Sequence, residues 1–176
     1  MSKKAIFLDR DGTLIVDKDY QYKIHDITLL PGAQEGLSLM KQLGYDLFLF
    51  TNQSGIGRGY FTLEEAEHCN EAMVKMFGLG MDLFKETKIA PERPDQPSRY
   101  RKPSPRFILE MIEKYAYDPS QCWMVGDKMS DVQAGLNAGI HGAFICSGKE
   151  EPKEFGKVPY YPSLLAFARQ LDASNE

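Results

Sequence analysis

The 176-residue chain lacks any apolar run that approaches the length of a transmembrane helix. A helix that crosses a bilayer needs about 20 consecutive apolar residues, so we expect no membrane partner. The residues that follow Met1 also lack the apolar core and the small-residue cleavage site of a signal peptide. We therefore expect a cytoplasmic protein.

Cysteine is scarce, and excess positive charge is absent. The three cysteines, Cys69, Cys122 and Cys146, are widely spaced, which fits neither a disulfide framework nor a paired-cysteine metal or redox motif. We expect them to be buried thiols. The chain has 21 Lys and Arg against 25 Asp and Glu, a net charge of −4. Nucleic-acid backbones are bound by clustered excess Lys and Arg, so we expect no nucleic-acid partner.

The composition that remains is typical of a globular protein, with 43% hydrophobic and 26% charged residues. A chain of this length can build one full core but not two comfortable ones. No internal repeat, linker or low-complexity segment divides it. We therefore expect a single domain over residues 1–176, and we take a monomer as its state.

Short β-prone apolar runs alternate with segments of helical periodicity, which is typical of an α/β fold with a parallel sheet and crossover helices. The predicted strands are Lys4–Leu8, Asp46–Thr51, Leu83–Ile89, Cys122–Val125 and Gly142–Cys146. The predicted helices are Ala33–Leu43, Leu63–Phe77, Pro105–Tyr115, Ser130–Ala138 and Ser163–Leu171.

Local signals support the helix boundaries. Thr62 followed by Glu65 is a candidate capping box for the second helix. Ser104 before Pro105 is a candidate N-cap with proline at the first helical position. Two stretches lack regular periodicity and are predicted to be loops near the ligand crevice, Val16–Leu30 and Ala90–Pro103.

Two carboxylates, Asp9 and Asp11, directly follow the first predicted strand, and Gly12 then allows a sharp turn. In an open α/β sheet, the carboxyl ends of the strands face the ligand crevice. The pair is therefore a candidate catalytic site with a carboxylate nucleophile. A surface turn with a solvated acidic pair is the alternative that this segment alone leaves open.

Two further segments carry groups that bind phosphate. The second strand ends in a polar, glycine-rich stretch from Thr51 to Gly59, whose hydroxyl, amide and arginine groups can donate hydrogen bonds to phosphate oxygens. Arg101 and Lys102 place positive charge just before the helix at Pro105. Taken singly, the two segments also fit an ordinary strand-to-helix loop and a solvated basic turn.

The fourth predicted strand also ends in acids, Asp127 and Asp131. With Asp9 and Asp11 they would bring up to four carboxylates into one crevice, which is unfavourable unless a cation neutralises them. Oxygen ligands without His or Cys indicate a hard cation, and Mg²⁺ binds in proteins through one or two carboxylates together with substrate phosphate.

In this order, D-R-D-G-T, T-N-Q after an apolar strand, R-K-P and G-D-x-x-x-D resemble the four signature motifs of the haloacid dehalogenase (HAD) superfamily of phosphohydrolases. The segments S-G-I-G-R-G-Y-F-T, Y-R-K-P-S-P and V-G-D-K-x-x-D-x-Q-A-G are closest to the D-glycero-D-manno-heptose 1,7-bisphosphate 7-phosphatases, with the histidinol-phosphate phosphatases next. The resemblance implies a Rossmann-like parallel sheet flanked by helices, with a minimal cap.

The resemblance also implies the chemistry. Asp9 would attack phosphorus, and Asp11 would protonate the leaving alkoxide and then activate water. Mg²⁺ would be held by Asp9, Asp127 and the backbone carbonyl of Asp11. Lys128 and Asp131 would support this metal site.

The remaining assignments concern phosphate and substrate. The groups that would hold the phosphoryl oxygens are Thr51, Asn52 and Lys102. Arg58 and Arg101 are candidates for binding the rest of the substrate, because an arginine fork pairs well with a second anionic group; a surface salt bridge is the alternative. Gln53 is the third substrate-binding candidate.

One family pattern is missing. Members of this branch often bind a structural zinc through C-x-H and C-x-C in the loop before R-K-P. Here Ala90, Glu92, Ser98 and Tyr100 occupy the ligand positions, and a structural zinc site needs Cys or His ligands. We predict no zinc, and the loop must be ordered by other means.

The expected activity is therefore the Mg²⁺-dependent hydrolysis of a small sugar phosphate through an aspartyl-phosphate, with a heptose 1,7-bisphosphate as the leading substrate. Histidinol phosphate is the alternative substrate. A catalytically silent protein of the same fold that binds a partner is the alternative from another class. That alternative would require one of the key carboxylates to be missing, and none is missing.

Overall fold

A computed structural model describes residues 2–151 and 158–174 of the chain. In this part, a six-stranded sheet has the order β3-β2-β1-β4-β5-β6, and all five strand pairs are parallel. The strands are β1 Ala5–Leu8, β2 Asp46–Asn52, β3 Glu86–Ala90, β4 Trp123–Gly126, β5 His141–Ile145 and β6 Tyr160–Tyr161. The expected Rossmann-like α/β fold is therefore confirmed.

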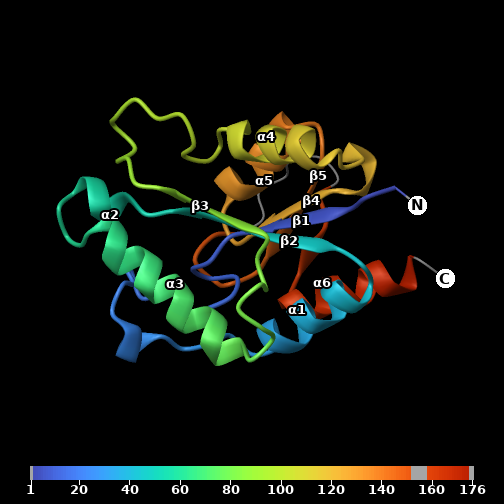
Figure 1. Cartoon of the computed structure of the whole chain (residues 1–176), viewed down its shortest axis with the longest axis horizontal. Coiled ribbons are helices and arrows are strands. Elements are labelled where there is room, and N and C mark those ends of the chain that lie inside the picture. Colours follow the sequence, from blue (N-terminus) through green and yellow to red (C-terminus); the bar gives the residue numbers. More distant parts are fainter. Residues whose placement is uncertain (1, 152–157, 175–176) are drawn as a thin grey trace.

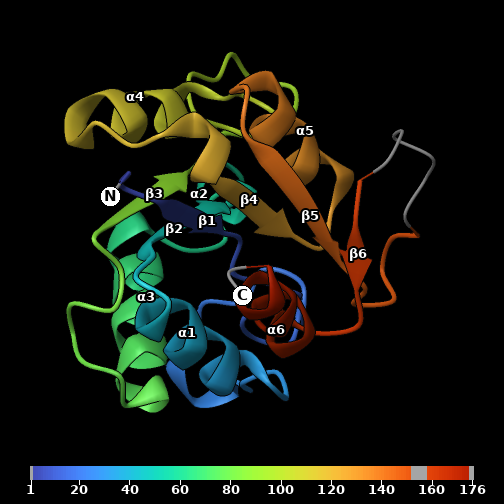
Figure 2. The same cartoon turned by 90° about the vertical axis from the view of Figure 1, so that its right-hand side faces the viewer.

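Helices cover both faces of the sheet (Figures 1 and 2). The helices on one face are α1 Ala33–Gln42, α3 Leu63–Phe77 and α6 Leu164–Ala173, and those on the other are α4 Arg106–Tyr115 and α5 Met129–Asn137. The short elements are η1 Ile24–Asp26, α2 Ser54–Gly57 and η2 Pro119–Gln121. No helix in the described part of the chain is both long and apolar enough to cross a membrane.

The central strand β1 has no exposed side chain and contributes to a core on each face. Ile6 and Leu8 belong to the core beneath α1, α3 and α6, whereas Phe7 belongs to the core beneath α4 and α5. Successive side chains of a strand point to opposite faces, and a strand buried on both faces reads as a continuous apolar run. Phe7 stacks on Phe48 with the ring centroids 4.8 Å apart.

Most predicted boundaries agree with the structure to within two residues, and the capping box of Thr62 and Glu65 is present at the start of α3. The predicted strand Leu83–Ile89 is wrong at its beginning, because β3 starts at Glu86. Leu83 is buried in the core, but its backbone lies in a turn region where its N–H bonds to Gly80. Its hydrophobicity therefore reflects core burial rather than strand pairing.

Three smaller expectations also need correction. Helix α4 begins at Arg106 with Pro105 at the cap position. Ser104 Oγ donates to the Arg99 carbonyl at 2.7 Å and accepts a long, 3.4 Å hydrogen bond from the Arg106 N–H. Cys146 is exposed, although Cys69 and Cys122 are buried as expected. The two-residue strand β6 was not predicted, because so short a strand leaves no periodic pattern.

Candidate active site

Asp9 and Asp11 lie where β1 ends and the chain turns. The backbone N–H of Asp9 donates to Val125 of β4 at 3.0 Å, which extends the sheet ladder to the first carboxylate. Gly12 follows with φ +80°, and a Cβ at this position would lie 2.0 Å from Oδ2 of Asp127. Only glycine therefore allows the turn to approach the carboxylate at the end of β4.

A buried lysine joins the segments that meet here. The Nζ atom of Lys102 lies 2.8 Å from Oδ1 of Asp9 and 2.7 Å from Oδ1 of Asp131, and it donates to the carbonyl of Phe50 at 2.6 Å. Burial favours the neutral amine, but the combined attraction of Asp131 and Asp9 outweighs it and raises the pKa of Lys102. The ammonium is thus charged and all three of its N–H groups have partners.

Asn52, at the end of β2, fixes the backbone of that lysine. Its Oδ1 accepts from the Lys102 N–H at 3.0 Å, and its Nδ2 donates to the Lys102 carbonyl at 3.2 Å. The side-chain amide thereby pairs with the loop as a neighbouring strand would. Next to it, Thr51 is buried and its Oγ1 accepts from Nε2 of Gln53 at 2.8 Å.

Three carboxylates, those of Asp9, Asp127 and Asp131, each place one oxygen within 4.8 Å of the others. Both oxygens of Asp131 are engaged, because Oδ1 faces Lys102 and Oδ2 accepts from the backbone N–H of Lys128 at 3.0 Å. Asp127 differs. Its Oδ2 accepts from Ser147 at 2.7 Å, whereas its Oδ1 is buried with no hydrogen-bond partner among the described residues.

This arrangement fits a divalent cation. Burial, followed by the charges of Asp9 and Asp131, raises the pKa of Asp127 to about 8. Burial and Asp131 likewise raise the pKa of Asp9, although Lys102 opposes them. A buried oxygen without a donor and mutual repulsion among carboxylates are both relieved by a hard cation with oxygen ligands. The site therefore suits Mg²⁺.

Lys128 is less tightly placed than Lys102. Its Nζ lies 3.9 Å from Oδ2 of Asp17, and the side chain is half-exposed. Burial opposes its charge, but Asp9 and Asp127 attract it and the balance raises its pKa. The side chain of Lys128 therefore interacts with Asp9 and Asp127 through its charge. The hydrogen bond between Lys128 and Asp131 is made by the backbone N–H of Lys128.

Asp11 is held by two side chains. Arg10 donates from Nε to Oδ2 at 3.1 Å and from Nη2 to Oδ1 at 3.2 Å, and Gln53 donates to Oδ2 at 3.0 Å. Burial raises the pKa of Asp11, and the positive charge of Arg10 limits that increase. The carboxylate therefore combines a fixed orientation with a raised affinity for a proton.

Sequence reasoning missed Arg10, Asn70 and Ser147. Arg10 is fully buried although it lies between two acids, and a charge in a segment that enters the core requires partners. Ser147 follows the end of β5, and β5 neighbours β4. The rule that strand ends converge, applied to β5, would have indicated Ser147; no local pattern indicates Asn70.

The two arginines that are candidates for substrate binding, Arg58 and Arg101, lie near each other. We call Arg58 and the loop of residues 90–101 the rim of the site. Burial and then the positive charge of Arg58 lower the pKa of Arg101. Arg101 donates from Nη1 to the carbonyl of Glu92 at 3.2 Å, and neither arginine forms an ion pair within the described ranges. The charge of Glu92 partly offsets that of Arg58 at Arg101, but no close ion pair forms in the described part of the chain. Two neighbouring guanidinium groups without a close ion pair suit an anionic ligand better than the surface salt bridge considered as the alternative.

Hydrogen bonds order the loop that precedes Lys102. Ser98 Oγ donates to Glu92 at 3.2 Å and accepts from the Arg101 N–H at 2.8 Å, and Tyr100 donates to Glu110 of α4 at 3.1 Å. The N–H of Gly57 in α2 bonds to Pro91 at 2.9 Å. Ser98 and Glu92, which occupy two of the family's zinc-ligand positions, therefore bond to each other. The absence of zinc stays a prediction.

The comparisons with known proteins agree with this geometry. A family model described as HAD-hydrolase-like matches residues 99–171. The chain is 41% identical over 143 residues to the D-glycero-beta-D-manno-heptose-1,7-bisphosphate 7-phosphatase of Helicobacter pylori, covering 79% of this chain and 81% of that one. It is 35% identical over 175 residues to the D-glycero-alpha-D-manno-heptose-1,7-bisphosphate 7-phosphatase of Campylobacter jejuni, covering 98% and 99%.

A crystal structure supports the same conclusion. The D,D-heptose 1,7-bisphosphate phosphatase from B. bronchiseptica, complexed with magnesium and phosphate, superposes with a TM-score of 0.85 at 26% identity. The match covers 97% of this chain and 99% of that one. The fold is therefore shared along almost the full length of both chains.

Proposed function

Because this chain belongs to the D-glycero-D-manno-heptose-1,7-bisphosphate 7-phosphatase family of the HAD superfamily, we propose that it removes the 7-phosphate of that sugar bisphosphate in a Mg²⁺-dependent reaction. One observation carries the proposal. Asp9 is bonded to the charged Lys102 beside Asp127, whose buried Oδ1 lacks a partner among the described residues. A nucleophile, a phosphate-binding cation and a metal ligand are thereby brought together.

Asp9 and Asp11 divide the reaction into two displacements. In the first, a carboxylate oxygen of Asp9 forms a bond to phosphorus, the bond from phosphorus to the sugar oxygen breaks, and Asp11 gives its proton to the departing alkoxide. In the second, Asp11 takes a proton from water as the water oxygen bonds to phosphorus. The bond to Asp9 then breaks and inorganic phosphate leaves. The raised pKa of Asp11 suits a group that must hold a proton first and accept one later.

Asp9, Asp127 and the backbone carbonyl of Asp11 would hold Mg²⁺, with Lys128 and Asp131 in support. The metal supplies positive charge that neutralises the carboxylates and the phosphoryl group. Asp131 contributes through Lys102, because its Oδ1 fixes the ammonium that also contacts Asp9. Asp131 would therefore pair with Lys102, while Asp9 and Asp127 would hold the metal.

The phosphate contacts are proposed from the same geometry. Lys102, Thr51 and Asn52 would bind the transferring phosphoryl oxygens, where charge-assisted donors are strongest. Lys102 would do so by exchanging one of its three present acceptors for a phosphoryl oxygen. Arg58 and Arg101 would bind the second phosphate, and Gln53 would orient Asp11 next to the substrate. The substrate thus spans from the buried centre to the rim.

The test is Mg²⁺-dependent phosphate release from the α and β anomers of heptose 1,7-bisphosphate, from histidinol phosphate and from common sugar phosphates, with Asp9→Asn as the blank. We expect one heptose anomer to lead by about 100-fold in kcat/KM, which corresponds to ~2.7 kcal/mol of transition-state discrimination. A lead for histidinol phosphate would favour the alternative substrate. No release above the blank would overturn the phosphatase assignment.

A further inference from the structure

Arg10 is the largest fully buried side chain of the described residues, and it carries a charge. Its guanidinium contacts three separate segments. Nε and Nη2 bond to the two oxygens of Asp11, Nη1 donates to Oδ1 of Asn70 in α3 at 3.0 Å, and Nη2 also donates to the carbonyl of Gln21 at 2.6 Å. Four hydrogen bonds therefore fix the plane of this group.

A role in packing alone does not account for this residue. A buried charge is unfavourable unless it is paired and hydrogen-bonded, and an apolar side chain of similar volume is often at least as stabilising. Within the described ranges, the sole carboxylate that forms an ion pair with Arg10 is that of Asp11. The buried charge of Arg10 is thus compensated by one residue of the site, Asp11.

The contact has the geometry that orientation requires. A guanidinium presents its donors in a rigid planar fork and fixes the plane of the carboxylate that it pairs with. Gln53, which directly follows β2, adds a third donor to Asp11. A misplacement of about 1 Å in a reacting group can cost on the order of 100-fold in rate, so a general acid and base needs such support.

We propose that Arg10, itself held by Asn70, is the positioning residue that orients Asp11 for proton transfer. The inference rests on the proposed phosphatase reaction and adds a residue to it. Asn70 sets the guanidinium from the helix α3 side, because an arginine can only donate and the amide oxygen must therefore face it.

The leaving group separates this role from a structural one. A sugar alkoxide must receive a proton as it departs, so its transfer depends on an oriented Asp11. The p-nitrophenolate anion departs without a proton, so p-nitrophenyl phosphate can phosphorylate Asp9 even when Asp11 is displaced. The dependence of kcat/KM on the leaving group therefore reports the position of the acid, because kcat/KM covers the steps up to the first transfer.

Two variants displace the fork to different extents. Arg10→Lys keeps the charge and loses the two-pronged contact. Asn70→Leu keeps the number and branching of the side-chain heavy atoms, and it removes one polar contact only, because Nδ2 of Asn70 has no partner among the described residues. Gln34→Leu is the matched control. It removes an amide hydrogen bond of 2.7 Å from α1 to the carbonyl of Phe77, at the C-terminal end of α3.

The experiment measures kcat/KM of each variant with the heptose bisphosphate and with p-nitrophenyl phosphate in saturating Mg²⁺. For Arg10→Lys we expect the sugar phosphate to lose about 100-fold, the scale of general acid catalysis, and the aryl ester to lose less than about fivefold. Asn70→Leu should shift the ratio the same way by about tenfold. Gln34→Leu should leave the ratio unchanged. A burst of nitrophenolate should also emerge in Arg10→Lys, because hydrolysis of the aspartyl-phosphate still needs Asp11 as base.

Equal losses with both substrates, or no loss, would overturn the inference. If Arg10→Lys does not fold, the ratio for Asn70→Leu decides alone. If the wild-type enzyme prefers another alkyl phosphate, the assignment of the heptose fails, and the same ratio measured with the preferred substrate still tests the role of Arg10.

Discussion

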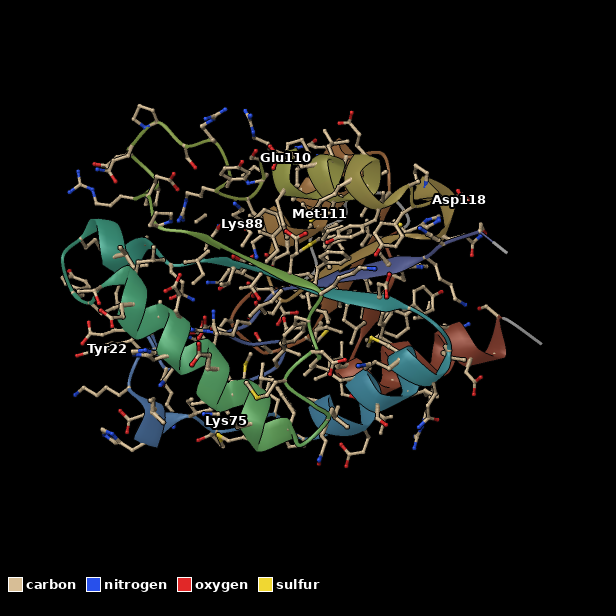
Figure 3. All side chains as sticks on the ribbon, in the orientation of Figure 1. Tyr22, Lys75, Lys88, Glu110, Met111 and Asp118 are labelled. Carbon is tan, nitrogen blue, oxygen red and sulfur yellow. The ribbon has the colours of Figure 1, made fainter. Side chains whose placement is uncertain are left out.

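The buried centre of the site and its exposed rim are held together in different ways. In the centre, hydrogen bonds join residues that are far apart in sequence, with separations of 93 residues for Lys102 and Asp9 and 60 for Arg10 and Asn70. In the rim, most of the side-chain bonds are local, although the backbone N–H of Gly57 bonds to the distant Pro91. The separations are 2 residues for Arg93 and Asp95, 3 for Arg101 and Ser98 and 6 for Ser98 and Glu92. Figure 3 shows the rim loop standing away from the densely packed interior above α2.

This difference between centre and rim indicates that the residues proposed for the reaction are held more rigidly than those proposed for substrate selection. Removal of one charged partner in the centre leaves another charge buried and unpaired, which is strongly unfavourable. Exposed pairs in the rim contribute about 0–1 kcal/mol each, so the rim tolerates exchange. The family's zinc-ligand positions in the rim hold Ala90, Glu92, Ser98 and Tyr100, while every carboxylate expected in the centre is present. Substrate preference can therefore diverge without disturbing the reaction.

The largest effect is expected for Lys102→Met, which removes the charge that joins the centre. The variant leaves Asp9 and Asp131 buried without their ammonium partner. We expect the free energy of unfolding of the metal-free protein to fall by about 3–5 kcal/mol. We expect kcat to fall by about 10²–10³-fold, the loss typical of one transition-state donor. Chemical denaturation and steady-state kinetics measure the two effects.

Lys114→Met is the matched control. Its ammonium pairs with Glu86 on the surface, where the lysine side chain is 54% exposed. That variant should lose no more than about 1 kcal/mol of stability and should keep its activity. Similar losses in the two variants would remove the distinction between a buried charge of the centre and an exposed ion pair. Added Mg²⁺ should restore more stability to Lys102→Met than to Lys114→Met, because the cation and Lys102 would both neutralise Asp9.

The sequence predicts the fold well because each layer leaves its own periodic pattern. The continuous apolar run of β1 and the capping box of Thr62 and Glu65 each indicate one structure, and both are present. The strand predicted to begin at Leu83 starts too early because hydrophobicity reports burial, and a turn can bury a side chain as well as a strand can. The two-residue strand β6 depends on pairing with β5, a contact that local sequence does not encode.

The site is predictable where its residues follow strand ends. Asp9 and Asp127 come together because β1 and β4 end at one edge of the sheet, and Asp131 joins them from the first turn of α5. Ser147 obeys the same rule but sits in an unremarkable stretch, and Asn70 reaches the site from the middle of α3. A single sequence reveals groups that form motifs, whereas supporting contacts across tens of residues emerge once the helices are docked.

An intermediate effect is expected for Ser147→Ala, which tests how firmly the centre holds its proposed metal ligand, Asp127. Ser147 donates to Oδ2 of Asp127 and so aims the other oxygen, which has no partner in the described part of the chain. Groups that orient metal ligands typically contribute 10–100-fold to metal affinity. We expect Mg²⁺ to activate the variant at about 30-fold higher concentration, within that range, with kcat at saturating Mg²⁺ nearly unchanged. An unaltered Mg²⁺ requirement would show that Asp127 needs no such support.

The smallest effect is expected in the rim, for Arg101→Ala and Arg58→Ala. Neither guanidinium group forms a close ion pair in the described part of the chain, and burial and then the charge of Arg58 lower the pKa of Arg101, with Glu92 opposing them. Loss of either should raise KM for the bisphosphate by roughly tenfold, the value of one charge-assisted hydrogen bond, with little change in kcat. A substrate with a single phosphate, which lacks the second anion, should show almost no change. Arg93→Ala, which breaks the exposed pair with Asp95 in the same loop, is the control. An equal increase in KM for mono- and bisphosphates would mean that the two arginines order the loop rather than bind the second phosphate. The rim would then resemble the centre, because its charged residues would position other groups instead of contacting the substrate.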